Sequence, residues 1–151
     1  MVIRPPLEGD IETLLDLGAQ MHRESAYSFL PYDRQKVRAF IVSYIEDRIT
    51  RCSLVAEIDG AIIGMIGGTI MDYYFCHEVL VADEILFVRS DHRTGMAALA
   101  LIRGLQKWAT HQGARELCLS VSSSVNYEAT DKLYERLGFN RVGGVFKKRL
   151  N

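Results

Sequence analysis

Cysteine is scarce in this chain of 151 residues, and the three cysteines, Cys52, Cys76 and Cys118, are widely scattered. An odd number without paired spacing fits neither a disulfide framework nor the common zinc patterns. Each cysteine is flanked by strand-like sequence. We therefore expect buried free thiols in a reducing compartment, and no metal site.

A surplus of one charge is missing as well, because the formal net charge is −1. Nucleic-acid-binding domains usually carry a basic excess, so no nucleic acid partner is expected. The longest apolar run, residues 61–70, is too short and too rich in glycine to span a bilayer. The first residues also lack the apolar core of a signal peptide, which favours a cytoplasmic protein without a membrane partner.

The chain has an ordinary globular composition, with 48% apolar and 25% charged residues. Its length suits a single domain over residues 1–151. Apolar periodicity predicts an α/β protein in the order β-α-α-β-β-β-α-β-α-β, with a mixed sheet covered by helices. The expected elements are strand 2–4, helices after Asp10 and Asp33, strands 53–58, 61–70 and 84–88, a helix from about Gly95 to Gly113, strand 116–121, helix 126–137 and strand 141–148.

Local signals set several of these boundaries. Asp10 and Asp33 are placed to cap the first two helices. Asp59-Gly60 is a strong hairpin signal between two strands. The pair Gly67-Gly68 indicates a bulge or a close backbone approach. Gly113 is a plausible left-handed helix cap.

The junction after strand 84–88 indicates a phosphate site. A short basic loop with Arg93 and Gly95 leads into a long alanine-rich helix. The start of a helix presents unpaired N–H groups and the positive end of its dipole, which suits a phosphate. We expect the N–H groups of Gly95 to Ala98, with the charge of Arg93, to bind the diphosphate of a nucleotide-like cofactor. The alternative is a polar strand-to-helix turn with no ligand.

Two blocks of sequence resemble the GNAT superfamily of acetyl-CoA-dependent N-acetyltransferases over nearly the whole chain. The first is Arg93-x-x-Met96-x-Ala98 followed by Ala100-Leu101-Ile102, in the place of the family's Q/R-x-x-G-x-G/A signature. The second runs from Asn126 through Leu133-Tyr134-Glu135 to Gly138-Phe139. The resemblance implies a mixed, mostly antiparallel central sheet with helices on both faces. It also implies acetyl-CoA as cosubstrate and, as in many relatives, a homodimer.

The chain departs from the family pattern in the first block. Met96 and Thr94 stand where the family usually has glycine, which lets the backbone approach a pyrophosphate closely. The shifted register His92-x-x-Gly95-x-Ala97 restores the glycine. The first register keeps the helical pattern, and the Met96 side chain could point away from the phosphates. In the second block, Asn126 lies one residue farther from Tyr134 than is common.

The resemblance also implies that the cofactor's arm pairs as a pseudo-strand with the backbone of Phe87 and Val88. Such pairing requires the fourth and fifth strands to part, so that backbone groups stay unpaired. In the family a bulge does this. The expected cofactor-binding residues are Phe87, Val88, Arg93, Thr94, Gly95, Met96, Ala97, Ala98 and Asn126.

Acetyl transfer to an amine needs a base and an acid. A lysine-like amine with a pKa of about 10.4 is almost fully protonated near pH 7, so a base or a water relay would speed attack. Glu84 is the candidate base, two residues before Leu86, unless it is only a surface carboxylate. Tyr134 is the candidate acid for the departing thiolate, unless it is only a core tyrosine.

The acceptor is the least determined part. Aromatic and acidic residues in segments 22–32 and 72–78 suit an amine with positive charge. The function expected is direct acetyl transfer, in a ternary complex, from acetyl-CoA to a primary amine of a small molecule or protein. The alternative is a non-catalytic acyl-CoA-binding or interaction module, which Met96 and Thr94 motivate.

Overall fold

The computed structural model describes residues 1–93, 96–121 and 123–150. Five strands form one sheet in the order β1-β2-β3-β4-β5, antiparallel except for the parallel pair β4–β5. The elements are β1 (Val2–Arg4), η1 (Glu8–Asp10), α1 (Ile11–Glu24), α2 (Arg34–Glu46), β2 (Arg51–Ile58), β3 (Ala61–Asp72), β4 (Val79–Val88), η2 (Ser90–His92), α3 (Met96–His111), β5 (Glu116–Cys118) and α4 (Tyr127–Arg136).

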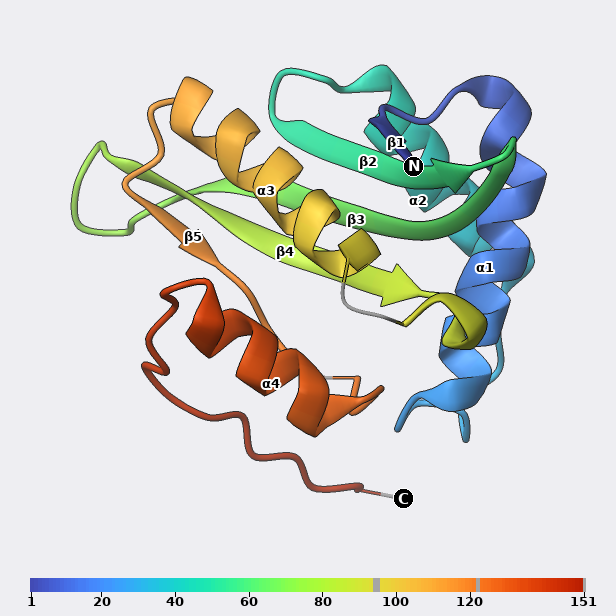
Figure 1. Cartoon of the computed structure of the whole chain (residues 1–151). Helices are drawn as coiled ribbons and strands as arrows, with labels where there is room; N and C mark the ends of the chain where they lie inside the picture. The colour runs from blue at the N-terminus through green and yellow to red at the C-terminus, as the bar shows by residue number, and fades with distance from the viewer. Residues whose placement is uncertain (94–95, 122, 151) are drawn as a thin grey trace.

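Helices cover both faces of the sheet, as predicted (Figure 1). On one face, α3 buries Leu101 and Leu105 against Ile63 of β3, and α4 adds Tyr134 to the same cluster. On the other face, α1 packs its apolar stripe on the sheet. The alternation of side chains along the strands lets one sheet serve both layers.

A bulge interrupts β4 at Glu84. Gly67 pairs with Ile85, but the next residue, Gly68, pairs with Asp83, so Glu84 has no partner on β3. A Cβ atom on Gly68 would lie 3.1 Å from the Ala82 carbonyl oxygen. The bulge or close approach predicted at Gly67-Gly68 is therefore confirmed, and both occur.

Most of the local signals are confirmed, with one exception. The Asp33 carboxylate accepts from the N–H groups of Gln35 and Lys36, at 2.9 and 3.0 Å, and so caps α2. Asp59 and Gly60 both have positive φ, as the hairpin requires. Gly113 also has a positive φ.

Asp10 does not cap α1 with its side chain, so that prediction is wrong. It occupies the N-cap position, but its carboxylate accepts from the Leu7 N–H and pairs with Arg4. The carboxylate is thereby committed to the preceding turn and to β1. With these partners, the Asp10 carboxylate makes no hydrogen bond to the first N–H groups of α1.

The strand expected at residues 141–148 is not formed, so the final β of the predicted order is wrong. A strand needs a neighbour for its backbone groups, and β5, at the edge, offers only Glu116–Cys118. The cysteine prediction is also partly wrong, because Cys52 is buried while Cys76 and Cys118 are exposed. Within the described ranges, no helix combines the length and apolar character that a membrane crossing needs.

Candidate active site

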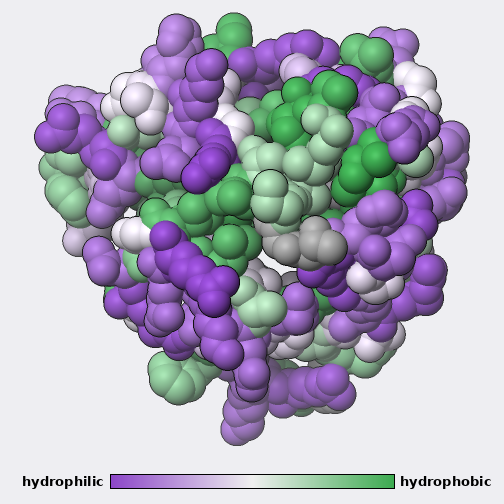
Figure 2. Space-filling view, viewed as in Figure 1, coloured by the Kyte–Doolittle hydropathy of each residue, from purple (hydrophilic) through white to green (hydrophobic). Residues whose placement is uncertain are grey.

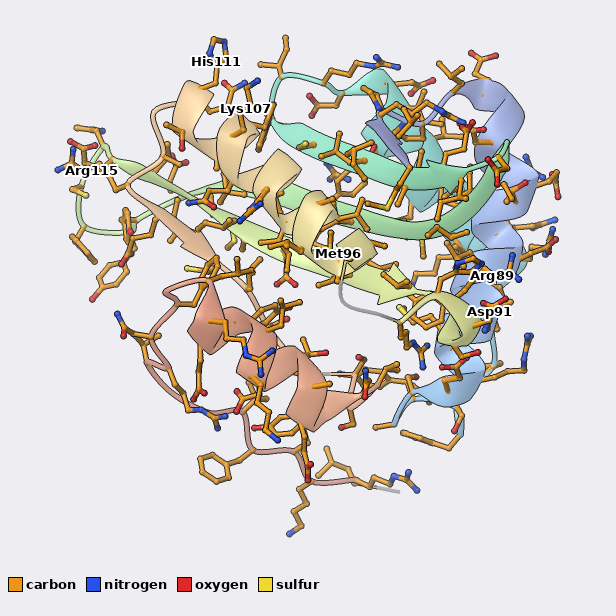
Figure 3. All side chains as sticks on the ribbon, viewed as in Figure 1. Arg89, Asp91, Met96, Lys107, His111 and Arg115 are labelled. Atoms are coloured by element: carbon orange, nitrogen blue, oxygen red, sulfur yellow. The ribbon has the colours of Figure 1, made fainter. Side chains whose placement is uncertain are left out.

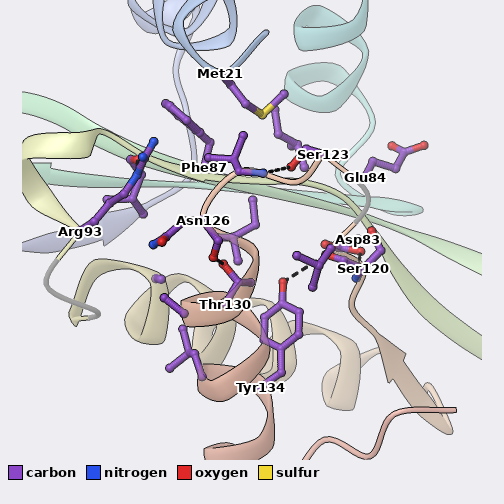
Figure 4. A pocket seen from close by; sticks show the side chains of 18 of the residues that line it. Met21, Asp83, Glu84, Phe87, Arg93, Ser120, Ser123, Asn126, Thr130 and Tyr134 are labelled. Carbon is purple, nitrogen blue, oxygen red and sulfur yellow. Dashed lines mark hydrogen bonds between the residues drawn. The ribbon is translucent and has the colours of Figure 1, made fainter. Parts of the chain in front are cut away.

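The site is a cleft that opens where β4 and β5 separate. The two strands pair only from Leu80↔Glu116 to Ala82↔Cys118, and the rest of β4 has no partner on that side among the described residues. A cavity of about 360 Å³ fills the gap, lined by β4, the chain between β5 and α4, and α4 itself. Figure 2 shows this face hollowed near its middle, and Figure 4 shows the lining side chains. The separation expected from the resemblance is present.

The free edge of β4 presents backbone groups to this cavity. Backbone groups of successive residues point to opposite edges of a strand. The Arg89 N–H donates to the Ile63 carbonyl of β3, so Val88 faces the other edge, toward the gap. The same alternation turns Leu86 to the gap and Phe87 toward β3. The backbone groups of Leu86 and the Val88 N–H therefore face the gap, where the sequence pointed to Phe87 and Val88, and the Val88 carbonyl accepts from Arg93.

Arg93 is engaged within the protein. Its Nε donates to the Val88 carbonyl at 2.7 Å, and its Nη2 pairs with Glu24 of α1 at 2.5 Å. Burial of Glu24 is the largest single influence and opposes ionisation, but the hydrogen bonds from Arg93 and Gln20 and the nearby positive charges together lower the pKa of that carboxyl. Arg93 thus ties the loop before α3 to α1. Of the residues expected beside it, Thr94 and Gly95 lie outside the described residues.

The first turn of α3 contributes backbone N–H groups. Met96, Ala97 and Ala98 open the helix, and the first N–H groups of a helix have no partner within it. Ala98 lines the cavity and Ala97 packs into the core. The Met96 side chain is 62% exposed, at the start of the helix in Figure 3. The side chain that replaces the family's glycine therefore points to solvent.

Tyr134 lies in the wall formed by α4, as Figure 4 shows. It is 7% exposed, packs on the Phe139 ring at 5.8 Å, and its hydroxyl donates to the Ser120 carbonyl at 3.4 Å. Burial, with a smaller contribution from the charge of Asp83, raises the pKa of Tyr134 well above its usual value. The phenol therefore stays protonated and can donate to an anion in the cavity.

The adjacent carboxylates Asp83 and Glu84 point to opposite faces of β4. Glu84 is exposed and accepts from the hydroxyls of Tyr44 and Thr69, the latter at 3.1 Å, on the α2 side. Asp83 crosses the gap and accepts from the Ser120 N–H at 2.8 Å. Chiefly because of burial, the pKa of Asp83 is raised to about 6.

The bulge decides which of the two adjacent carboxylates lies on the Tyr134 side of β4. In a regular strand Glu84 would share a face with Leu86, which packs in the α3 cluster. The extra residue reverses the alternation and leaves Asp83 on that face instead. Sequence reasoning missed Asp83 as a site residue, although an acidic pair opposite Gly67-Gly68 was a usable signal.

Asn126 stands at the mouth of the cleft, at the start of α4. Its φ of 50° places it in the left-handed region, which asparagine tolerates better than most residues. Its carbonyl accepts from Thr130, while its side chain makes no capping bond to the helix. In Figure 4 the amide is directed toward the cavity.

A sheet that divides beside a helix N-terminus, with a protonated tyrosine in the gap, defines the class of an acyl-transferase-like α/β protein. Comparison with known proteins gives the family. Residues 16–139 match the Acetyltransferase (GNAT) family. The chain belongs to this family, which confirms the resemblance read from its two sequence blocks.

The relatives are N-acetyltransferases. N-acetyltransferase 8 of Homo sapiens is 33% identical over 104 residues, covering 69% of this chain. The chain spans 44% of that protein's length, less than half. The aminoglycoside N-acetyltransferase AAC(6')-Iy, solved with the bisubstrate analogue CoA-S-monomethyl-acetylneamine, shares the fold with a TM-score of 0.78 at 23% identity, covering 99% of this chain and 97% of that one. The ribosomal-protein-alanine N-acetyltransferase of Brucella melitensis biovar Abortus 2308 gives a TM-score of 0.73 at 20% identity, covering 99% of this chain and 100% of that one.

Proposed function

We propose that the chain transfers an acetyl group from acetyl-CoA directly to a primary amine of a small molecule or protein, in a ternary complex. The observation that carries the proposal is the opening between β4 and β5, with the α3 N-terminus at the cleft and Tyr134 in its wall. The relative AAC(6')-Iy, solved with a CoA-containing bisubstrate analogue, supports acetyl-CoA as the cosubstrate.

Backbone groups suit the two ends of this cosubstrate. The N–H groups of Met96, Ala97 and Ala98 would hold the diphosphate, where each hydrogen bond to a charged group contributes about 1.5–3 kcal/mol. The groups of Leu86 and Val88 that face the gap, with the Asn126 amide, would hold the extended arm. Acetyl-CoA supplies the activated acetyl thioester, and the chain's own residues position it and move protons.

Proton transfer falls to Asp83 and Tyr134. The amine nitrogen bonds to the thioester carbonyl carbon while its proton passes to the Asp83 carboxylate, directly or through a water. The carbon–sulfur bond then breaks, and the Tyr134 hydroxyl gives its proton to the thiolate. The proton held by Asp83 restores the tyrosine through solvent, so the products are the amide and CoA thiol. Glu84, held by Tyr44 and Thr69, is the alternative base.

The test is thiol release from acetyl-CoA with a panel of primary amines, together with calorimetric binding of acetyl-CoA. We expect binding by the wild type and turnover with at least one class of amine. Tyr134→Phe should bind acetyl-CoA as the wild type does but lose most of the turnover. Absence of acetyl-CoA binding by the folded chain would overturn the proposal.

A further inference from the structure

The loop between α1 and α2 closes one end of the cavity. The Ala26 N–H donates to the Ser123 carbonyl at 2.9 Å, which joins this loop to the segment before α4. Tyr27, the next residue, lines the cavity. Phe29, two residues on, is 52% exposed. Tyr27 therefore lies at the boundary between the cavity and the outer surface of the loop.

Two of the three aromatic rings of this loop, those of Tyr27 and Phe29, hold cations in the structure. The Lys147 Nζ lies 4.5 Å from the centroid of the Tyr27 ring and also donates to its hydroxyl. The Arg149 Cζ lies 3.8 Å from the centroid of the Phe29 ring. An aromatic face attracts a cation through its quadrupole. The pair of rings therefore accepts two positive charges side by side.

Two cations from one short segment lie on these two rings of one short loop. Tyr27 and Phe29 are two residues apart, as are Lys147 and Arg149. Tyr27 and Phe29 lie in a turn, in which the Leu30 N–H donates to the Tyr27 carbonyl at 2.9 Å, and each ring meets one of the two cations. Phe146 in the same segment is 99% exposed, so apolar packing of its ring does not hold the segment to the loop.

We propose that Tyr27 and Phe29 form a subsite for the second positive charge of a dicationic acceptor. The inference rests on the proposed function, because it takes the neighbouring cavity as the place where an amine is acetylated. The reacting amine passes Tyr27 into the cavity, and the second cation stays on Phe29. Lys147 and Arg149 imitate such an acceptor in this structure. The chemistry required is two cations on one short scaffold that can reach both rings, which both α,ω-diamines and Lys-x-Arg peptides provide.

The test compares each dication with a matched monocation, by calorimetry in the presence of CoA and by kcat/KM with acetyl-CoA. The probes are α,ω-diamines against alkylamines of the same length, and the peptide Lys-Ala-Arg against Lys-Ala-Ala. We expect the dication to be preferred by about threefold to thirtyfold, the range that one cation–π contact supplies. Phe29→Leu should bring that ratio close to one. The better of the two dications identifies the source of the acceptor.

A second set of variants changes the two cations instead of the two rings. The double variant Lys147→Ala, Arg149→Ala removes the internal competitor and should tighten dication binding about threefold or more. Lys148→Ala, between them in the chain, is the matched control and should change nothing. Equal binding of dication and monocation, or a preference that survives Phe29→Leu, would overturn the subsite.

Failure of the subsite and failure of the proposed function give different results. Tighter calorimetric binding of the dication than of the monocation, without any acetylation, would contradict the proposed function and still support the subsite. Acetylation of monocations and dications at equal kcat/KM, with equal affinity, would contradict the subsite and still support the proposed function.

Discussion

The two walls of the cleft are built very differently. β4 is paired to β3 at nine register positions, whereas β5 is tied to β4 at only three. The β4 wall is also packed between helices on both faces, while the other wall consists of a short edge strand and α4 (Figure 1). The well-paired wall supplies backbone groups that must be fixed in space. The thinly paired wall carries Tyr134, the proposed proton donor.

The largest effect expected is on the thin wall, at Tyr134. Tyr134→Phe removes only a hydroxyl with one long hydrogen bond, so the stability of the fold should change by less than about 1 kcal/mol. Loss of the proton donor should lower kcat about 100-fold to 1000-fold. Thiol release measures kcat, and thermal melting measures the stability of the fold. A kcat within about threefold of the wild type would show that the thiolate is protonated elsewhere.

The next effect concerns Asp83, which bridges the two walls through Ser120. As a base it must be ionised, so kcat should fall as pH drops through about 6, its raised pKa. Asp83→Asn should lower kcat about 10-fold to 100-fold above pH 7 and remove this acid limb. The pH–rate profile of Glu84→Gln is the matched comparison. If the acid limb of the pH–rate profile disappears in Glu84→Gln and survives in Asp83→Asn, Glu84 is the base.

The same variant should be more stable than the wild type at neutral pH. The pKa of Asp83 is about 6 in the folded state, above the usual unfolded value, so the folded state binds this proton more tightly. That contribution is complete below about pH 4 and is lost as pH rises through 6. At pH 7.5 Asp83→Asn should therefore gain up to about 2–3 kcal/mol. Urea unfolding of both proteins at pH 7.5 and at pH 4 measures this difference in stability. A stability gain of Asp83→Asn that persists at pH 4 would contradict the prediction.

Changes on the well-paired wall should affect stability first. A Cβ atom on Gly64 would lie 3.0 Å from both the Phe87 carbonyl oxygen and the Val88 side chain. Gly64→Ala should therefore destabilise the fold by about 1–3 kcal/mol. Gly143→Ala, where nothing lies within 4 Å of the new atom, should stay within about 0.5 kcal/mol. Equal unfolding midpoints for the two variants would show that the close packing of Gly64 against β4 does not limit the stability of the fold.

The smallest effect is expected at the first turn of α3. Met96→Pro deletes one N–H at a helix position that tolerates proline, whereas Met96→Ala keeps the N–H and removes only an exposed side chain. The Kd of acetyl-CoA should rise about tenfold in the first variant. The second should stay within about twofold of the wild type. Calorimetry measures the Kd of acetyl-CoA for both variants. A larger rise in Kd for Met96→Ala than for Met96→Pro would mean that the Met96 side chain itself contacts acetyl-CoA.

The sequence predicted the fold where short-range chemistry decides it. Asp59-Gly60 favours a hairpin through local backbone preference, and the helix expected from about Gly95 to Gly113 is observed as Met96–His111. The strand predicted at residues 141–148 failed because β structure depends on a partner, which a local pattern cannot supply. Asp83 was missed for a related reason. Which of two adjacent carboxylates faces the cleft depends on the register between β3 and β4, where the bulge at Glu84 reverses the alternation.

Amide hydrogen exchange with and without acetyl-CoA tests the central claim most directly. If the gap between β4 and β5 holds the thioester arm and the start of α3 holds the diphosphate, residues 86–88 and 96–98 should become protected. The helix α2, on the far face of the sheet, should exchange as before. Unchanged exchange at both segments, under conditions where acetyl-CoA is bound, would contradict the account.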